Sequence, residues 1–458
     1  MKKDALNFLI FTSKLILLYF LISFLVIIFI LPVYIIADKL GLLAFINNFL
    51  GINGGFWGGF GKIGGFLAST VIGITLITAI LMVSVIINVW IERKLSAKIQ
   101  GRMGPTLVNI PFLLKQGSKN IWLGGLLQPI ADVAKLIQKE IMIPQGSYPF
   151  LFILSPVLAF VTVVIAFGMF PFSNNYILLG NLDVGLLFIF AVSSYMVLSL
   201  VIAAWTSNNK YSLIGGLRTV SQMLSYEIPL LLSFLSLIVF TGSFKIVDIV
   251  NFQNSYFWLI FYQPLVFLIF LWSMVAENNR APFDLPEAES ELVAGFATEY
   301  SGMTFALFYL AEYGYLFFNS AIISVLFLGG YSLLPHSLIN SLSHLFQSLG
   351  IYDYIIAVND NFIWIILKSF LVVGLIMFFR WTYPRIRIDH LMDLAWKAFI
   401  PITLVHIIIA SVDVLLFKGQ QFFVPIFSWL FFVVVLYLAS LRNIKLSSVK
   451  YKNLPDIG

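Results

Sequence analysis

The sequence contains no cysteine, few histidines and few charged residues. Without cysteine, the chain can form no disulfide and supplies no thiolate ligand to a metal ion or an iron–sulfur cluster. Its histidines are scattered, which argues against a histidine-ligated metal or haem; they are His336, His344, His390 and His406. We therefore expect no metal site in this chain.

The chain has few charged residues and many hydrophobic ones. Only 10% of the 458 residues are Asp, Glu, Lys or Arg, and 60% are hydrophobic, whereas about a quarter of a soluble domain is charged. A helix needs roughly 20 mostly apolar residues to cross a bilayer. The sequence therefore predicts an all-α fold, a polytopic membrane helix bundle of about ten transmembrane helices. The expected spans are 9–36, 66–91, 148–170, 182–205, 220–240, 257–276, 303–328, 362–380, 397–417 and 422–441.

The distribution of basic residues supports this topology. With a cytoplasmic N-terminus, 21 Lys and Arg residues lie in cytoplasmic connections and four lie in the opposite ones, as the positive-inside rule requires. The net charge of +6 therefore has a topological cause, and no nucleic-acid partner is needed to explain it.

Three connections between predicted spans have an unusual composition. Residues 126–141, "LLQPIADVAKLIQKEI", place apolar residues on one stripe and polar residues opposite, which predicts an amphipathic surface helix lying against the membrane or a partner. Residues 47–65 are glycine-rich and are expected to form a loop. Residues 329–361 lack Lys and Arg and are expected to contain a short helix.

Carboxylates gather in the stretch "ENNRAPFDLPEAESELVAGFATEY", residues 277–300, around Arg280. Two more, Glu227 and Glu312, lie inside predicted spans, where an ionised side chain costs roughly 2.5–3.5 kcal/mol. These acids either form a proton path or are neutral, hydrogen-bonded groups that lock helices together. Within the stretch, Asp284 could also cap a helix that has Pro286 in its first turn.

Basic residues gather in "WIERKLSAKIQGRMGP", residues 90–105, and in "RWTYPRIRIDHLMDLAWK", residues 380–397. Both stretches follow predicted spans, so positive-inside charge is one explanation. Arginine is the better bidentate donor to carboxylates, and the arginine-rich parts favour docking to an acidic or polar partner domain.

Six stretches occurring in order resemble one family, the quinone-chamber membrane subunit of NADH-quinone oxidoreductase, which is respiratory complex I. The six are "ERKLSAKIQGRMGP", "LLQPIADVAKLIQKE", "NKYSLIGGLRTVSQMLSYEIPL", "AENNRAPFDLPEAESELVAGFATEYSGM", "FALFYLAEY" and "RWTYPRIRIDHLMDLAWKAFIP". The resemblance runs from about residue 68 to 402. It implies a family core over 66–402. The N-terminal helix and glycine-rich loop over 1–65, the insertion 329–361 and the last span, which lies in the C-terminal helices and basic tail over 403–458, depart from the family.

The resemblance implies a membrane subunit that couples quinone reduction by electrons from NADH to proton translocation. The residues matching the family's quinone tunnel and docking positions are Arg93, Arg102, Asp132, Arg280, Phe283 and Arg385. The acids matching its proton path are Glu227, Glu277, Asp284, Glu287, Glu289, Glu291, Glu299 and Glu312.

It further implies that this chain binds no redox cofactor and that quinone is the substrate. Iron–sulfur clusters and FMN are expected in partner subunits. The expected partners are the peripheral-arm iron–sulfur and quinone-site subunits, the small membrane subunits, the antiporter-like subunits and membrane lipids. The expected location is a bacterial plasma membrane, with the mitochondrial inner membrane as the alternative. The first competing hypothesis is the homologous membrane subunit of a membrane-bound hydrogenase or ferredoxin-linked complex. The second is a stand-alone secondary transporter.

Overall fold

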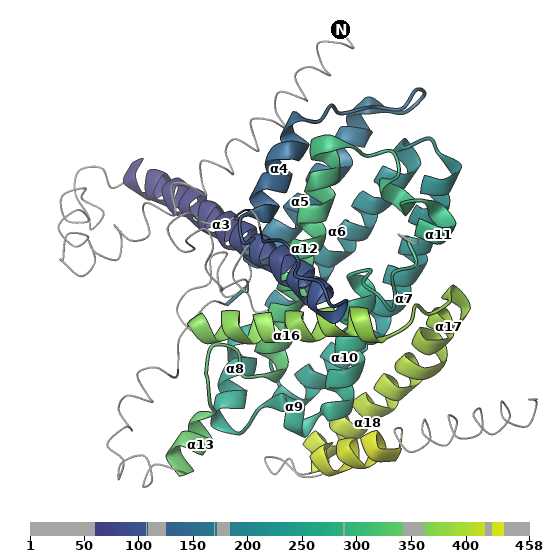
Figure 1. The fold of residues 1–458 in the computed structure, drawn as a ribbon. Helices are drawn as coiled ribbons and strands as arrows, with labels where there is room; N and C mark the ends of the chain where they lie inside the picture. Colours follow the sequence, from purple (N-terminus) through teal and green to yellow (C-terminus); the bar gives the residue numbers. More distant parts are fainter. Residues whose placement is uncertain are drawn as a thin grey trace, which may run out of the picture. The chain divides into compact units, whose positions relative to one another are not determined.

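Helices make up the described part of the chain (Figure 1). The computed structural model describes residues 60–106, 108, 125–168, 170–171, 184–286, 289–341, 359, 362–416 and 424–434. Its elements are α3 (Phe60–Ile99), α4 (Gln128–Gln138), α5 (Pro149–Gly168), α6 (Gly185–Thr206), α7 (Lys210–Thr241), α8 (Ile246–Ser255), α9 (Leu259–Tyr262), α10 (Pro264–Glu277), α11 (Glu289–Leu292), η2 (Gly295–Ala297), α12 (Gly302–Phe327), α13 (His336–Ser341), α16 (Phe362–Thr382), α17 (Ile388–Asp393), η3 (Leu394–Phe399) and α18 (Ile400–Leu416). The predicted all-α class is confirmed.

Six described helices are long and apolar enough to cross a membrane. They cover Pro149–Gly168, Gly185–Thr206, Lys210–Thr241, Gly302–Phe327, Ile363–Thr382 and Ile388–Leu415. Each contains most of a predicted span, and the structure is consistent with a polytopic helical bundle. The predicted span 9–36 lies outside the described residues, as does the loop 47–65.

Two predicted elements differ in detail. The expected span 257–276 is divided at Gln263 into α9 and the 14-residue α10, and Pro264, which lacks an N–H, starts the second piece. Helix α7 begins at Lys210, ten residues before the predicted start, because the helix continues beyond the apolar run on which the prediction was based.

The described chain divides into two units. The first comprises the described residues up to Ser221, Asn278–Ala321 and Ser369–Arg385. The second comprises Gln222–Glu277 and the described residues in 322–368 and 386–434. Helices α7, α12 and α16 each contribute residues to both units.

In the first unit, α5 and α6 lie side by side (Figure 1), and α12 packs close to α3 and α5. Gly314 of α12 makes this approach possible. A Cβ at Gly314 would lie 3.1 Å from Val163 of α5 and 3.2 Å from Leu81 of α3. The ring of Phe167 packs against Phe318, with 5.0 Å between ring centroids. Tight helix packing thus holds α12 in place.

The loop before α12 is anchored by Tyr300. Its ring stacks on Phe152 of α5 at 4.1 Å between centroids, and its hydroxyl lies 2.9 Å from the hydroxyl of Ser155. Because both contacts are made with α5, the polar stretch 278–301 is fixed at its C-terminal end.

In the second unit, buried polar contacts join the helices. Ser236 of α7 lies 2.9 Å from the Nδ1 atom of His406 in α18, and the hydroxyl of Tyr226 donates to the carbonyl of Leu391 in α17 at 3.0 Å. Helices α17 and α18 are connected by η3, a π-helical turn. Such turns widen a helix locally.

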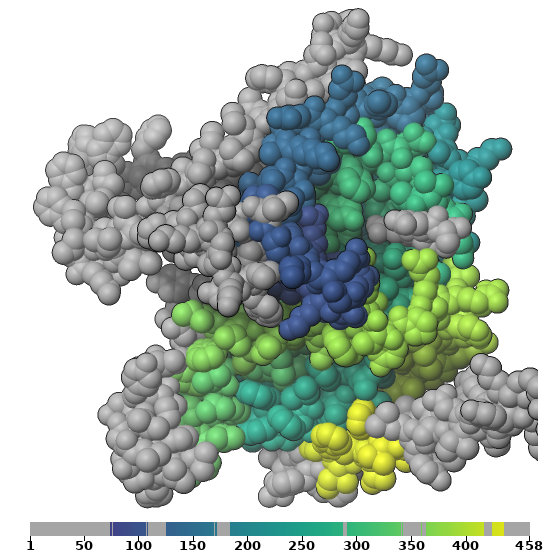
Figure 2. All heavy atoms as spheres, in the orientation of Figure 1, coloured from purple at the N-terminus to yellow at the C-terminus, as the bar shows by residue number. Residues whose placement is uncertain are grey.

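The predicted amphipathic helix is present as α4, with Pro129 in its first turn. The apolar residues Ile130, Val133 and Ile137 each have more than a third of their surface exposed. On the face drawn in Figure 2, the atoms of α4 adjoin those of α3. The apolar stripe is therefore open, and its contact with membrane or partner stays a prediction.

One interpretation of the acidic stretch predicted that Asp284 caps the start of a helix, and this prediction is wrong. Helix α11 covers only Glu289–Leu292, and Asp284 pairs with Arg385 rather than capping a helix. A short helix in 329–361 is present as α13.

Candidate functional site

The loop between α10 and α12 places one buried arginine between a buried and a partly buried carboxylate in the first unit. The side chain of Arg280 is 7% exposed. Its Nη1 atom lies 3.2 Å from Oε2 of Glu92, and its Nη2 atom lies 2.9 Å from Oε1 of Glu312. Glu92 comes from α3 and Glu312 from α12, so one guanidinium connects two helices that are distant in the sequence.

Two further side chains complete this group. Tyr313 donates its hydroxyl to Oε2 of Glu92 at 2.8 Å, and its ring centroid lies 4.3 Å from Cζ of Arg280. Arg380, near the end of α16, pairs with the other carboxylate oxygen of Glu92. We call Glu92, Arg280, Glu312, Tyr313 and Arg380 the buried charge cluster.

The buried charge cluster contains as many carboxylates as guanidiniums. Burying an ion costs several kcal/mol unless an opposite charge and hydrogen bonds compensate. Burial by itself would lower the pKa of Arg280, but Glu312, Tyr313 and Glu92 outweigh it and hold that pKa well above its usual value. Arg280 therefore stays charged, and a change in protonation falls to the acidic members.

The two carboxylates of the cluster are compensated unequally. Glu92 is bound by Arg280, Arg380 and Tyr313. The described residues provide Glu312 with one ion pair, to Arg280, and its side chain is 20% exposed against 10% for Glu92. Glu312 is thus the carboxylate whose charge depends most on a single partner.

Asp284 lies in the same loop as Arg280 and pairs with Arg385, with 3.4 Å between Oδ2 and Nη2. Burial raises the pKa of Asp284 above its usual range, although Arg385, Arg380 and Arg280 oppose this shift. The carboxyl is 19% exposed. Asp284 therefore takes up a proton at a higher pH than an aspartate in water.

Two other arginine–carboxylate pairs of the described residues in the first unit lie at the surface. Arg93 of α3 pairs with Asp132 of α4 at 2.5 Å, with exposed fractions of 45% and 35%. Arg218 of α7 pairs with Glu291 of α11, also at 2.5 Å. Each joins two elements of the first unit, but solvent screens both pairs.

This chain matches the family model described as "NADH dehydrogenase" over residues 72–411. That range is about three quarters of the chain and includes every member of the buried charge cluster. The chain belongs to the NADH dehydrogenase family.

Two similar curated relatives bear the same name. The H subunit of the NADH-quinone oxidoreductase of Geobacillus kaustophilus (strain HTA426) is 43% identical over 337 residues, covering 74% of this chain and 91% of the relative. The protein of the same name from Geobacillus thermodenitrificans (strain NG80-2) is 43% identical over 321 residues, covering 70% and 87%.

The structure brings together some of the site residues that the family resemblance assigns. Arg280 meets Glu312, Arg93 meets Asp132 and Arg385 meets Asp284, so each predicted tunnel arginine named here contacts a predicted carboxylate. Arg102 is exposed and hydrogen-bonds to Gln100. Phe283 is fully buried.

Other acids predicted for the proton path are not members of the buried charge cluster. Glu299 accepts a hydrogen bond of 2.7 Å from the Nδ2 atom of Asn209. Glu277 is buried and Glu227 is half-buried, and both belong to the second unit. Glu287 lies outside the described residues, and only the backbone of Glu289 is described.

Reasoning from the sequence did not assign Glu92 or Tyr313 to the site, and it considered Arg380 only within an arginine-rich stretch that favours docking to a partner. An acid directly before Arg93 at the end of a predicted span was the available signal for Glu92, since it interrupts a basic run. Tyr313 follows Glu312 in a helix rich in aromatic residues, and nothing in the sequence distinguishes it from its neighbours.

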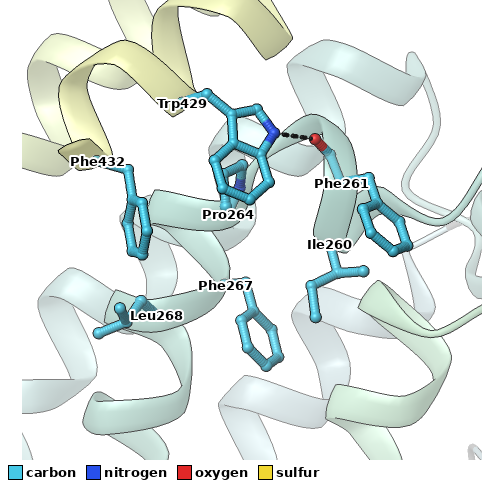
Figure 3. Close-up of a pocket in the computed structure, with 7 residues that line it drawn as sticks. All are labelled: Ile260, Phe261, Pro264, Phe267, Leu268, Trp429 and Phe432. Atoms are coloured by element: carbon cyan, nitrogen blue, oxygen red, sulfur yellow. Dashed lines mark hydrogen bonds between the residues drawn. The ribbon is translucent and has the colours of Figure 1, made fainter.

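The second unit contains an apolar cavity of about 270 Å³ between α9, α10 and the helix Val424–Val434 (Figure 3). Its lining residues are Ile260, Phe261, Pro264, Phe267, Leu268, Trp429 and Phe432. The indole N–H of Trp429 is already bonded to the carbonyl of Phe261 at 2.9 Å. The lining can therefore accept a hydrocarbon chain, but it offers no free polar group to orient a quinone headgroup.

Proposed function

We propose that this chain is the membrane subunit of an NADH-quinone oxidoreductase in which the buried charge cluster begins the path that couples quinone reduction to proton translocation. The observation that carries the proposal is the contact of Glu92 and Glu312 with one buried arginine. These three residues lie inside the segment matched by the family model. The two relatives are named as subunits of NADH-quinone oxidoreductase.

The chemistry follows from charge balance in a water-poor site. Reducing a quinone consumes protons and first adds negative charge to it. A negative charge near Arg280 competes with Glu312 for the guanidinium, and a carboxylate that loses its partner at low dielectric takes up a proton. Glu312 has one ion pair among the described residues, so it is our candidate for the group that changes protonation.

The surrounding residues would have distinct roles. Arg93, Arg102, Asp132, Phe283 and Arg385 would form tunnel and docking positions, beside Arg280. Glu227, Glu277, Asp284, Glu287, Glu289, Glu291 and Glu299 would continue the proton path. Residues 66–402 would be the family core.

The assembly that this function requires is larger than the chain. The described residues contain no group of three or more His, Cys, Asp and Glu able to hold a metal. Iron–sulfur clusters and FMN would lie in peripheral-arm partners, and antiporter-like subunits would receive the coupled change. The location would be a bacterial plasma membrane.

Purification of the tagged chain in mild detergent tests the assembly. We expect iron–sulfur subunits and NADH:quinone reductase activity to accompany it. Hydrogenase subunits without quinone reductase activity would replace this proposal with its closest competitor, and a lone chain would refute both.

A Glu312→Gln variant tests the coupling role. We expect quinone reduction and proton uptake into vesicles to fall by roughly 100-fold or more, as for loss of a positioned proton-transfer group, with normal assembly. Glu140→Gln is the matched control, since Glu140 is exposed and in the same unit. Equal pumping in both variants would contradict the role of Glu312.

A further inference from the structure

The second unit contains a buried cation in a setting unlike that of the charge cluster. Lys368 of α16 is 7% exposed, and it forms no ion pair with a carboxylate of the described residues. Its ammonium donates to three backbone carbonyls, those of Leu328, Gly330 and Ser332. An ammonium has three N–H donors, so each donor has one acceptor.

The three carbonyls belong to the turn that follows α12, and the backbone of that turn requires glycine. Gly329 and Gly330 have φ angles of 76° and 55°. A Cβ at Gly329 would lie 2.7 Å from the indole nitrogen of Trp258, and one at Gly330 would lie 3.0 Å from Val250. Any residue other than glycine at positions 329 and 330 would thus disturb the backbone conformation of the turn and its tight packing.

Side chains from α8 hold this turn without help from Lys368. Gln253, fully buried, donates to the carbonyl of Val325 and accepts from the N–H of Gly329, both at 2.9 Å. Ser332 donates its hydroxyl to Asn254. The carbonyls are therefore held in position by contacts that would remain if the lysine were shortened.

An aromatic face completes the surroundings of the ammonium. The Nζ atom of Lys368 lies 5.1 Å from the ring centroid of Trp258, within the range of a cation–π interaction. Carbonyl oxygens in a fixed array can replace the hydration shell of a monovalent cation. Three carbonyls and an indole face are the features expected of a site for a primary ammonium.

We propose that the turn 328–332 and the ring of Trp258 form a binding site for a primary ammonium cation, which Lys368 occupies as a tethered ligand. The hydrogen bonds of Lys368 to the turn then fix the C-terminal end of α12. This inference goes beyond the proposed function and does not depend on it, because the contacts that support it lie within the second unit.

Chemical rescue tests the site in the assembled complex. Lys368→Ala removes three methylene groups and the ammonium, a fragment that n-propylammonium replaces. We expect the variant to lower the midpoint of thermal inactivation by roughly 5 °C. Propylammonium should recover more than half of this loss, ethylammonium less, and tetramethylammonium, which has no N–H donor, none.

Lys397→Ala is the matched control, because Lys397 is 73% exposed and pairs with Asp393 at the surface. Propylammonium should leave its midpoint unchanged. Equal effects of propylammonium and tetramethylammonium on Lys368→Ala, or rescue of Lys397→Ala to the same extent, would overturn the proposal.

A second measurement covers the case in which Lys368→Ala does not assemble. Reductive methylation of the wild-type complex, followed by mass spectrometry, should modify Lys397 at least about tenfold faster than Lys368, because the ammonium of Lys368 is bound by carbonyls and buried. Similar rates for the two lysines would overturn the proposal.

Discussion

The chain pairs arginine with carboxylate both in its interior and at its surface, and the two settings have different consequences. Arg280 reaches Glu92 and Glu312 away from solvent, whereas Arg93 reaches Asp132 with nearly half of its side chain exposed. At the surface, water replaces a lost partner at little cost. In the interior, a lost partner leaves an uncompensated charge. Contact distance alone therefore does not show which pair matters.

The largest expected effect comes from replacing Arg280, which contacts both carboxylates of the buried charge cluster. Arg280→Met should destabilise the chain by about 3–5 kcal/mol, the usual result of removing one partner from a buried ion pair. The measurement is the thermal midpoint of the purified complex, together with the amount of assembled chain in membranes. Arg218→Met, which breaks a surface pair, is the control, and an equal loss in both would show that burial makes no difference.

A smaller effect is expected from Tyr313→Phe, which removes the hydroxyl that donates to Glu92 and keeps the ring beside Arg280. A hydrogen bond to a charged group contributes about 1.5–3 kcal/mol. The thermal midpoint should fall by a corresponding amount, while Tyr195→Phe, an exposed tyrosine of α6, should leave it unchanged. An unchanged midpoint for Tyr313→Phe would mean that Arg280 and Arg380 compensate Glu92 without it.

The pair of Asp284 and Arg385 is intermediate in exposure between the interior and the surface pairs. Titration of Asp284 should change how the stability of the chain depends on pH. Because burial raises the pKa of Asp284 in the folded chain, the folded state binds this proton more tightly than the unfolded state. The contribution of this group to stability therefore falls as pH rises from the ordinary aspartate pKa of about 3.9 to the raised folded value. Asp284→Asn should remove this slope.

Arg385→Ala should extend the same window to higher pH, because Arg385 opposes the upward shift. Thermal midpoints measured across the acidic range would record both changes. A profile of Asp284→Asn that coincides with the wild type would contradict the assignment.

The smallest stability effect is expected at the surface. Arg93→Ala should cost only about 0.2–1 kcal/mol, since its pair with Asp132 is exposed. If Arg93 docks a partner or guides quinone, the rate of quinone reduction should fall while the midpoint stays nearly constant. A large loss of stability with normal turnover would reverse the proposed contrast with Arg280.

Several features of the candidate site can be predicted from local sequence. The acids around Arg280 and the membrane-depth Glu312 stand out because charge is rare in the chain. Glu92 is overlooked because a basic run surrounds it, and Tyr313 because tyrosine beside other aromatic residues is ordinary. The capping role considered for Asp284 is wrong because a local pattern cannot show that Arg385, 101 residues later, approaches the carboxylate.

The amino-acid sequence was sufficient to establish a helical membrane chain, because apolar runs of sufficient length and the placement of basic residues are local properties. It was also sufficient for the family, because long motifs occur in order. Tertiary packing was needed to show that Glu92, Arg280, Glu312 and Arg380 meet in one cluster around the buried Arg280, and that Lys368 is held by backbone carbonyls. Helix formation depends on neighbours along the chain, whereas charge pairing depends on which helix faces pack together.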